Sequence, residues 1–283
     1  MKKIKVLALC AIVAGFTTSC EKKEVSNEIQ PEAVTKQISK AHIQALHDAG
    51  VNDFGATYGT VTHPDGSSEE VIKSGDLSLV IENLAEQRLA EIESGSKQYR
   101  TNNLVSSSNR NIRIIGYTGS GYALTSKMRT GLQWAVNNYN ALNNTLNFTL
   151  SFSASTNADM VVYNNGNSGA GGSAGFPSSG RPYKWVQINA GSNSLSNNAM
   201  EHLMGHEMGH CLGFRHTDYA KRRCDNSNEG SGGIGAIHIP GTPTANQWGQ
   251  SGLDTDSIMI SCFDGSEDGE FSSRDRTALN YLY

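Results

Sequence analysis

The most constraining feature of this 283-residue chain is a set of histidines at fixed spacing after residue 200. His206 and His210 are four residues apart, so both imidazoles project from one face of an α-helix. Gly213 follows them, and a glycine can adopt positive φ, end the helix and turn the chain back. His216 then reaches the same point from outside the helix. The spacing predicts a helix that ends at Gly213, with three imidazoles converging beside it.

These residue types indicate a metal centre. Three nitrogen ligands with an open fourth position are typical of a catalytic zinc site rather than a closed structural one. Glu207 follows the first histidine, where its carboxylate can reach a water on the metal without being a ligand. Histidines that make ordinary surface hydrogen bonds are the alternative, which the extended spacing H-E-x-x-H-x-x-G-x-x-H disfavours. We expect His202, one turn earlier, to pack or support a ligand rather than bind the metal.

The extended motif resembles that of the metzincin zinc peptidases. That clan has a Met-turn below the zinc, and the best match downstream of the third histidine is the segment 257–261, which makes Met259 the expected methionine. Together with residues 206–219 and the later stretch 239–243, the chain is most similar to a bacterial family described as dual-action HEIGH metallopeptidases. The resemblance covers roughly residues 70–283.

The resemblance implies an α/β (α+β) catalytic domain with a mixed twisted sheet, a backing helix, an active-site helix and a Met-turn. It also implies a zinc endopeptidase of proteins or peptides, in which Glu207 is the general base for a water polarised by the metal. The strand expected at Lys184–Asn189 would be the sheet edge that pairs with an extended substrate. The alternative is a surface binding protein of the same scaffold whose catalysis is silent or restricted.

The start of the chain is typical of an export signal. Met1–Lys5 is basic, and Val6–Phe16 is an apolar run of signal length that is too short to span a bilayer. The small residues before Cys20 resemble a bacterial lipoprotein signal, which implies removal of residues 1–19 and a lipid on Cys20. We therefore expect an exported lipoprotein at the outer membrane or cell surface, attached through that lipid only. A plain secretory signal, giving a secreted or periplasmic protein, is the alternative.

Residues 20–100 differ from residues 101–283, where we expect the catalytic domain. The segment 21–100 has 14 Asp and Glu against 8 Lys and Arg, so it carries most of the acidity of the chain. We expect it to be a tether or a pro-segment.

One motif in this segment suggests latency. Gly75 and Asp76 resemble the F-x-G-D motif of astacin propeptides, in which the aspartate binds the zinc, although Lys73 stands in place of the phenylalanine. The resemblance implies that Asp76 could hold the enzyme inactive. The alternative is that Asp76 caps a helix that the apolar spacing predicts over residues 77–93.

The composition argues against a nucleic-acid-binding protein. The net charge is −4, and no Lys/Arg cluster lies on a periodic segment, which argues against nucleic acid as a partner. Only 18% of residues are charged, and Gly, Ser and Asn make the surface polar. Nothing in the sequence requires an oligomer, and we expect a monomer.

The cysteines and acidic loops give further expectations. Cys224 and Cys262 lie in loop-like sequence and are expected to form a disulfide, with Cys211 buried on the helix. Asp218 could accept a hydrogen bond from a ligand histidine or stabilise a turn. Residues 225–229 offer oxygen ligands for calcium, but a solvated loop is the default.

Periodicity and turn residues also locate the main elements. Helices are expected at 37–49, 126–142, 197–212 and 272–282. Strands are expected at 54–62, 112–117, 146–153, 160–163 and 184–189. The four remaining histidines are expected at the surface: His42, His47, His63 and His238.

Overall fold

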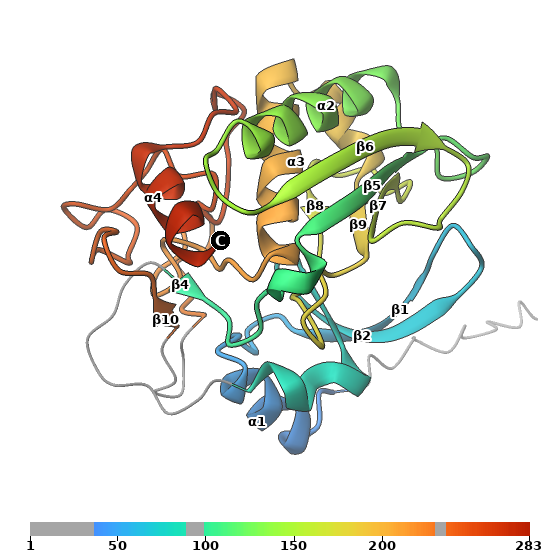
Figure 1. Cartoon of the computed structure of the whole chain (residues 1–283). Helices are drawn as coiled ribbons and strands as arrows, with labels where there is room; N and C mark the ends of the chain where they lie inside the picture. Colours follow the sequence, from blue (N-terminus) through green and yellow to red (C-terminus); the bar gives the residue numbers. More distant parts are fainter. Residues whose placement is uncertain (1–36, 89–98, 230–235) are drawn as a thin grey trace, which may run out of the picture. The chain divides into compact units, whose positions relative to one another are not determined.

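The alternating apolar segments after residue 110 form a five-stranded mixed sheet (Figure 1). A computed structural model describes residues 37–88, 99–229 and 236–283 of the chain. In sheet order, the strands are β6 (Asn147–Ser153), β5 (Asn111–Tyr117), β7 (Met160–Asn164), β9 (Trp185–Ile188) and β8 (Gly172–Ser173). The first four strands are parallel, and β8 runs antiparallel to β9 at one edge. The mixed α/β fold expected from the sequence is confirmed.

Two helices complete the core of this half. They are α2 (Ser126–Asn140), capped by Thr125, and α3 (Asn197–Cys211), capped by Ser196. The helices pack closely because Gly131 has no side chain: a Cβ atom there would lie 2.9 Å from the backbone carbonyl carbon of Met200. Every residue of α3 from position 199 to 211 is buried, so α3 is enclosed rather than amphipathic.

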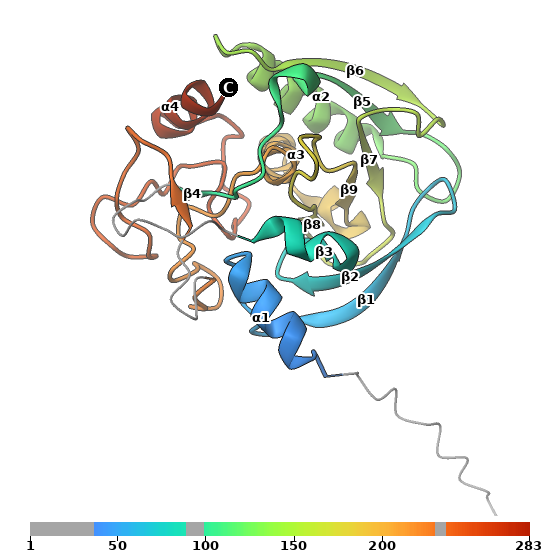
Figure 2. The same ribbon diagram turned by 60° about the horizontal axis from the view of Figure 1, so that its bottom comes forward.

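Residues 37–88 form a smaller layer on the side of α3 opposite α2 (Figure 2). It contains α1 (Lys40–Asp48) and the antiparallel strands β1 (Thr57–Thr62), β2 (Ser68–Ser74) and β3 (Leu77–Val80), in the order β1-β2-β3. Its apolar side chains form a separate small cluster that includes Leu46, Ile72 and Leu79.

The helix predicted over residues 77–93 is wrong. Leu77–Val80 instead pairs with the end of β2, and only a 3-10 helix, η1 (Ile81–Gln87), follows. Leu77 and Val80 fit helical spacing, but Leu77 and Leu79 also alternate along a strand, and β2 supplies a partner for that strand. Positions 89–93 lie outside the described residues.

Short elements connect and close the fold. They are β4 (Tyr99–Arg100), β10 (Ile237–His238), η2 (Ser107–Asn109), η3 (Ala190–Ser194) and α4 (Ser273–Leu282). β4 pairs with β10, so residues at the predicted boundary near 100 hydrogen-bond within the second half of the chain. The division at residue 100 stays a prediction.

The cysteine predictions are confirmed: Cys224 and Cys262 form a disulfide, and Cys211 is free and buried. The predicted signal segment, residues 1–19, and Cys20 lie outside the described residues. Among the described helices, none combines the length and apolar character needed to cross a membrane.

Candidate active site

The active-site helix presents two histidines side by side. His206 and His210 lie on α3, and their Nε2 atoms are 3.1 Å apart. Gly213 adopts φ of +100°, which lets the chain leave the helix. A Cβ atom at that position would lie only 2.7 Å from the carbonyl oxygen of Asn103, so a larger residue would also collide with the chain that passes there.

His216 and Asp76 complete the group. The Nε2 atom of His216 lies 3.3 Å from Nε2 of His206 and 3.1 Å from Oδ2 of Asp76. One ligand atom from each of these side chains and from His210 lies within 4.8 Å of the others. In the described part of the chain, this is the one such group of His, Cys, Asp and Glu side chains.

The three imidazoles fit a metal ion because each is held by its other ring nitrogen. The Nδ1–H groups of His206 and His210 donate to the carbonyl oxygens of Ile258 (2.7 Å) and Phe214 (2.9 Å). Nδ1 of His216 donates to Oε1 of Glu229 at 2.5 Å. These bonds fix the tautomer that leaves every Nε2 lone pair directed at the common centre, which is how proteins orient metal-binding histidines.

The segment around Met259 lies directly under the helix. Met259 is buried, and a Cβ atom on Gly209 of α3 would lie 2.4 Å from its sulfur. The carbonyl oxygen of Met259 accepts the amide of Thr217, the residue after the third histidine. Ile258, the preceding residue, anchors His206. The Met-turn expected from the sequence therefore supports the first and third histidines.

Glu207 is enclosed next to the strand β8. Its side chain is 1% exposed, and a Cβ atom on Gly172 would lie 2.7 Å from its Oε1 atom. Its Oε2 atom has no hydrogen-bond partner among the described residues. Burial and the nearby carboxylate of Asp76 raise the pKa of Glu207 well above its usual range.

Asp76 reaches the histidines from a tight turn between β2 and β3. Gly75 adopts φ of +61°, and a Cβ atom there would lie 2.4 Å from Nη1 of Arg222. The carbonyl oxygen of Asp76 accepts the amide of Ala174 (3.1 Å), and the amide of Ser78 donates to the carbonyl of Ala174 (2.8 Å). Residues 76–78 therefore run along the outer side of the sheet edge.

The strand at the sheet edge beside the histidines differs from the one expected to pair with substrate. The strand at Lys184–Asn189 was expected at the edge of the sheet, but β9 is flanked by β7 on one side and β8 on the other. The chain after β7 returns through a glycine-rich loop and adds Gly172–Ser173 as an antiparallel neighbour. The edge beside the histidines is therefore β8, whose continuation at Ala174 pairs in parallel with Leu77.

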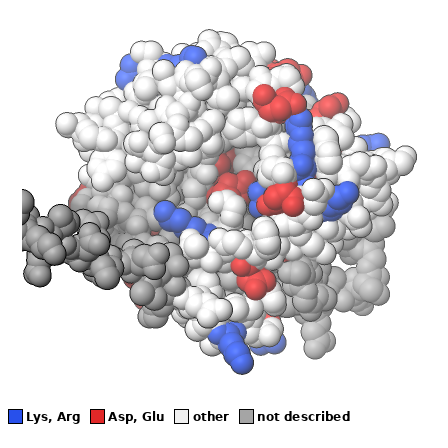
Figure 3. All heavy atoms as spheres, turned by 180° about the vertical axis from the view of Figure 1, so that it is seen from behind, with Lys and Arg blue, Asp and Glu red and all other residues white. Residues whose placement is uncertain are grey.

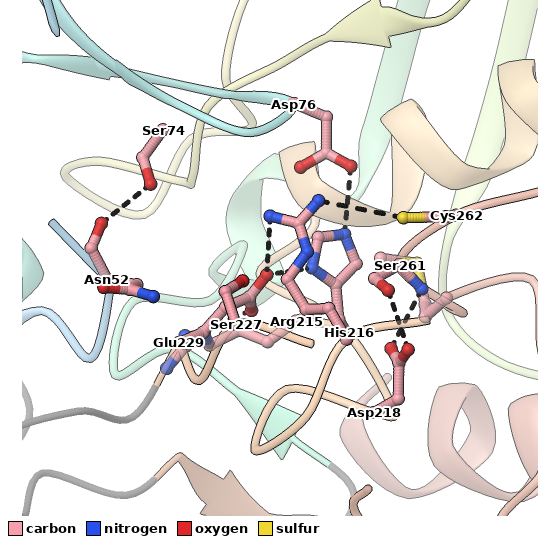
Figure 4. Close-up of polar contacts among 12 residues, drawn as sticks. Asn52, Ser74, Asp76, Arg215, His216, Asp218, Ser227, Glu229, Ser261 and Cys262 are labelled. Carbon is pink, nitrogen blue, oxygen red and sulfur yellow. Dashed lines mark hydrogen bonds and ion pairs between the residues drawn. The ribbon is translucent and has the colours of Figure 1, made fainter. Parts of the chain in front are cut away.

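Glu229 is the functional side chain that sequence reasoning missed. It lies in the loop that we expected to be solvated or to hold calcium, yet it is 4% exposed. Besides His216, Glu229 contacts Arg222 (3.4 Å) and Arg215 (3.6 Å) (Figure 4). Thirteen residues separate it from His216, and no helical or turn spacing predicts their contact.

The two carboxylates on either side of His216 dominate its electrostatics. Burial lowers the pKa of His216, but the carboxylates of Asp76 and Glu229 raise it to about 10. Burial also raises the pKa of Asp76, but His216 and the other histidines hold it well below its usual range. A metal ion at the centre needs the Nε2 lone pair of His216, so its binding would release the proton that this raised pKa favours.

Asp218 and the remaining histidines have other roles. Asp218 accepts hydrogen bonds from Ser261 and from the amide of Arg223, so it joins two loops rather than orienting a ligand (Figure 4). His202 lies outside the ligand group, with its ring 6.3 Å from that of His206.

The prediction that His63 lies at the surface is wrong. His63 is buried, because the β1–β2 turn carries it onto the ring of Trp185, with 4.2 Å between ring centroids. His42, His47 and His238 are partly exposed.

Comparison with known proteins identifies the family. The model for the dual-action HEIGH metallo-peptidases matches residues 71–283, about three quarters of the chain. The chain belongs to this family. It is therefore a metallopeptidase, with proteins or peptides as its substrates.

Solved structures and curated proteins add little to this identification. Two structures of myroilysin are similar at 17% identity. The first covers 62% of this chain and 80% of its own, with a TM-score of 0.38; the second covers 69% and 89%, with a TM-score of 0.37. Comparison with curated proteins finds no match.

Proposed function

We propose that this HEIGH metallopeptidase is an exported zinc endopeptidase in which Glu207 is the general base. The observation that carries the proposal is the convergence of three Nε2 atoms whose Nδ1 partners are all engaged. Three imidazoles with one further position suit zinc better than a hard, oxygen-preferring cation. His206, His210 and His216 would hold the ion.

Zinc, when bound, supplies Lewis acidity that lowers the pKa of a water and polarises the substrate carbonyl. Glu207 follows the first ligand on α3, so it lies beside the centre without being one of the ligands. Its carboxylate accepts the proton of the attacking water and then delivers that proton to the leaving amine. Met259 and Gly213 act indirectly, by supporting the ligands from below and by turning the chain toward His216.

We also propose that the segment before residue 99 keeps the enzyme latent. Two observations support this: Asp76 occupies the position next to the three histidines, and residues 76–78 hydrogen-bond to the sheet edge at Ala174. An extended substrate would need both places. Activation would require cleavage between Gln87 and Tyr99, because Tyr99 and Thr101 are buried and hydrogen-bonded to the catalytic half.

Export and lipid attachment at Cys20 are part of the same proposal, with a monomer as the expected state. Radiolabelled palmitate should be incorporated into the wild-type chain when it is expressed in a bacterial host, and not into Cys20→Ala. Incorporation into neither chain would favour the plain secretory signal.

Glu207→Ala tests the mechanism and is measured in the Asp76→Ala background, because the uncleaved wild type is proposed to be latent. We expect kcat to fall by about 10²–10⁴-fold, because the general base is lost, while the zinc content stays at one equivalent. Cleavage of a denatured protein and zinc content by mass spectrometry are the two measurements, with Glu82→Gln, an exposed carboxylate of η1, as the matched control. Unchanged cleavage by Glu207→Ala would contradict the mechanism. Bound zinc without any cleavage by the wild type or by Asp76→Ala would favour a binding protein.

A further inference from the structure

A cavity of about 340 Å³ opens beside the first half of α3, outside the ligand group. Its walls include His202, Arg223, Trp248, Asp256, Glu267 and Asp268. His202 is buried, Trp248 is partly exposed, and Asp256 and Asp268 are exposed. The cavity therefore has a buried imidazole at its inner end, an aromatic wall and carboxylates at its mouth.

The inner end carries an unused polar atom. The His202 side chain is 3% exposed, and its Nε2 atom has no hydrogen-bond partner among the described residues. A buried polar atom without a partner is costly and is uncommon in folded proteins. His202 lines the cavity, so a hydrogen-bond donor that reached its Nε2 atom from the cavity would satisfy it.

The cavity also lies close to the reaction centre. His202 and His206 are neighbours on α3, one helical turn apart, with ring centroids separated by 6.3 Å. One turn of helix rises by about 5.4 Å, which a Lys or Arg side chain can span. A residue of a peptide bound at the histidines could thus place a long side chain in the cavity.

The charges of the cavity favour a cation. Arg223 already pairs with Glu267 (3.5 Å) and with Asp264, and it lies over the ring of Trp248. No Lys, Arg or His among the described residues forms an ion pair with Asp256 or Asp268. Figure 3 shows Asp and Glu in small groups on a face that is otherwise largely uncharged.

We propose that this cavity is a specificity subsite for an arginine or lysine side chain of the substrate, next to the scissile bond. Asp256 and Asp268 attract the cationic group, and Nε2 of His202 accepts an N–H. Trp248, whose ring already carries Arg223, forms part of the wall. The role of the cavity as a substrate subsite rests on the proposed peptidase function. The binding of a cation in the cavity does not depend on that function.

Binding to the full chain tests the cavity without turnover. Nα-acetyl-arginine methylamide should bind about fivefold or more tightly than its neutral citrulline counterpart in calorimetric titrations, because two carboxylates contribute. The double variant Asp256→Asn/Asp268→Asn should abolish this difference. Glu270→Gln removes a neighbouring carboxylate that does not line the cavity and should preserve it. Equal binding of both amides, or the same loss in Glu270→Gln, would overturn the proposal.

Cleavage assays distinguish a basic preference of the cavity from peptidase activity itself. Zinc-loaded full chain, with and without Asp76→Ala, is given peptides that carry arginine or citrulline at one position beside the scissile bond. We expect the ratio of kcat/KM for arginine over citrulline to be about fivefold or more and to fall toward one in the double variant. Cleavage without any basic preference would overturn the subsite and leave the peptidase standing. Arginine binding without cleavage of any peptide would support the cavity and reject the peptidase.

Discussion

At the scale of single residues, the buried carboxylate of Glu229 determines how firmly the third ligand is held. Glu229→Gln keeps the size of the side chain but removes the charge that accepts the Nδ1–H of His216. Loss of such a partner typically weakens metal affinity by about 10–100-fold, so we expect a rise of that order in the zinc dissociation constant. Competition with a chromophoric chelator measures it.

Asp225→Asn is the matched control, because Asp225 belongs to the same loop but is exposed and accepts the amide of Ser227. Its zinc affinity should equal that of the wild type. Circular dichroism should show that Glu229→Gln is folded. Equal zinc affinity in Glu229→Gln and Asp225→Asn would show that Glu229 does not position the ligand.

At the scale of elements, α4 holds the Met-turn through one buried carboxylate. Asp275 accepts hydrogen bonds from the hydroxyl of Ser257, the amide of Ile258 and the amide of Ser272, which joins the capping box of α4 to the segment under the histidines. Burial raises the pKa of Asp275 to about 6, above its usual value of about 3.9.

This shift predicts how stability depends on pH. Because the folded state binds the proton of Asp275 more readily than the unfolded state, the ionised carboxylate costs stability above pH ~6, and this cost disappears as the pH falls toward ~4. Relative to Asp275→Asn, the free energy of unfolding of the wild type should therefore rise by about 1 kcal/mol between pH ~7.5 and pH ~5. Urea denaturation at saturating zinc measures both proteins. A constant difference across this range would contradict the shifted pKa.

At the scale of the whole molecule, the two halves of the chain meet at the metal position. Asp76 contacts a histidine 140 residues away, and the same turn pairs with Ala174. We expect Asp76→Ala to raise the activity of the uncleaved full chain about tenfold or more, because it removes a charged occupant of the fourth position. Peptide hydrolysis is measured while mass spectrometry verifies that the chain is intact.

Glu70→Gln controls for the loss of a carboxylate from the same small sheet. Glu70 is exposed on β2 and accepts a hydrogen bond from Thr60, away from the histidines. Its variant should be as inactive as the uncleaved wild type. If Asp76→Ala were equally inactive, Asp76 would have no inhibitory role.

Local signals along the chain were enough to predict several elements. The spacing of His206, His210 and Gly213 follows from one helix and its end, so it could be interpreted without any knowledge of packing. The caps of α2 and α4 also depend only on neighbouring residues. The physical basis of each of these features lies within a few residues of the chain.

The remaining features depend on contacts between residues that are far apart in the chain. Leu77–Val80 satisfies both helical and strand periodicity, and the available edge of β2 selects the strand. Glu229 becomes an orienting carboxylate, and β8 rather than β9 becomes the sheet edge, because loops without periodic patterns fold back onto α3 and β9. The free energy of such contacts depends on which distant residues meet and on the water they exclude, and a pattern along one segment contains neither.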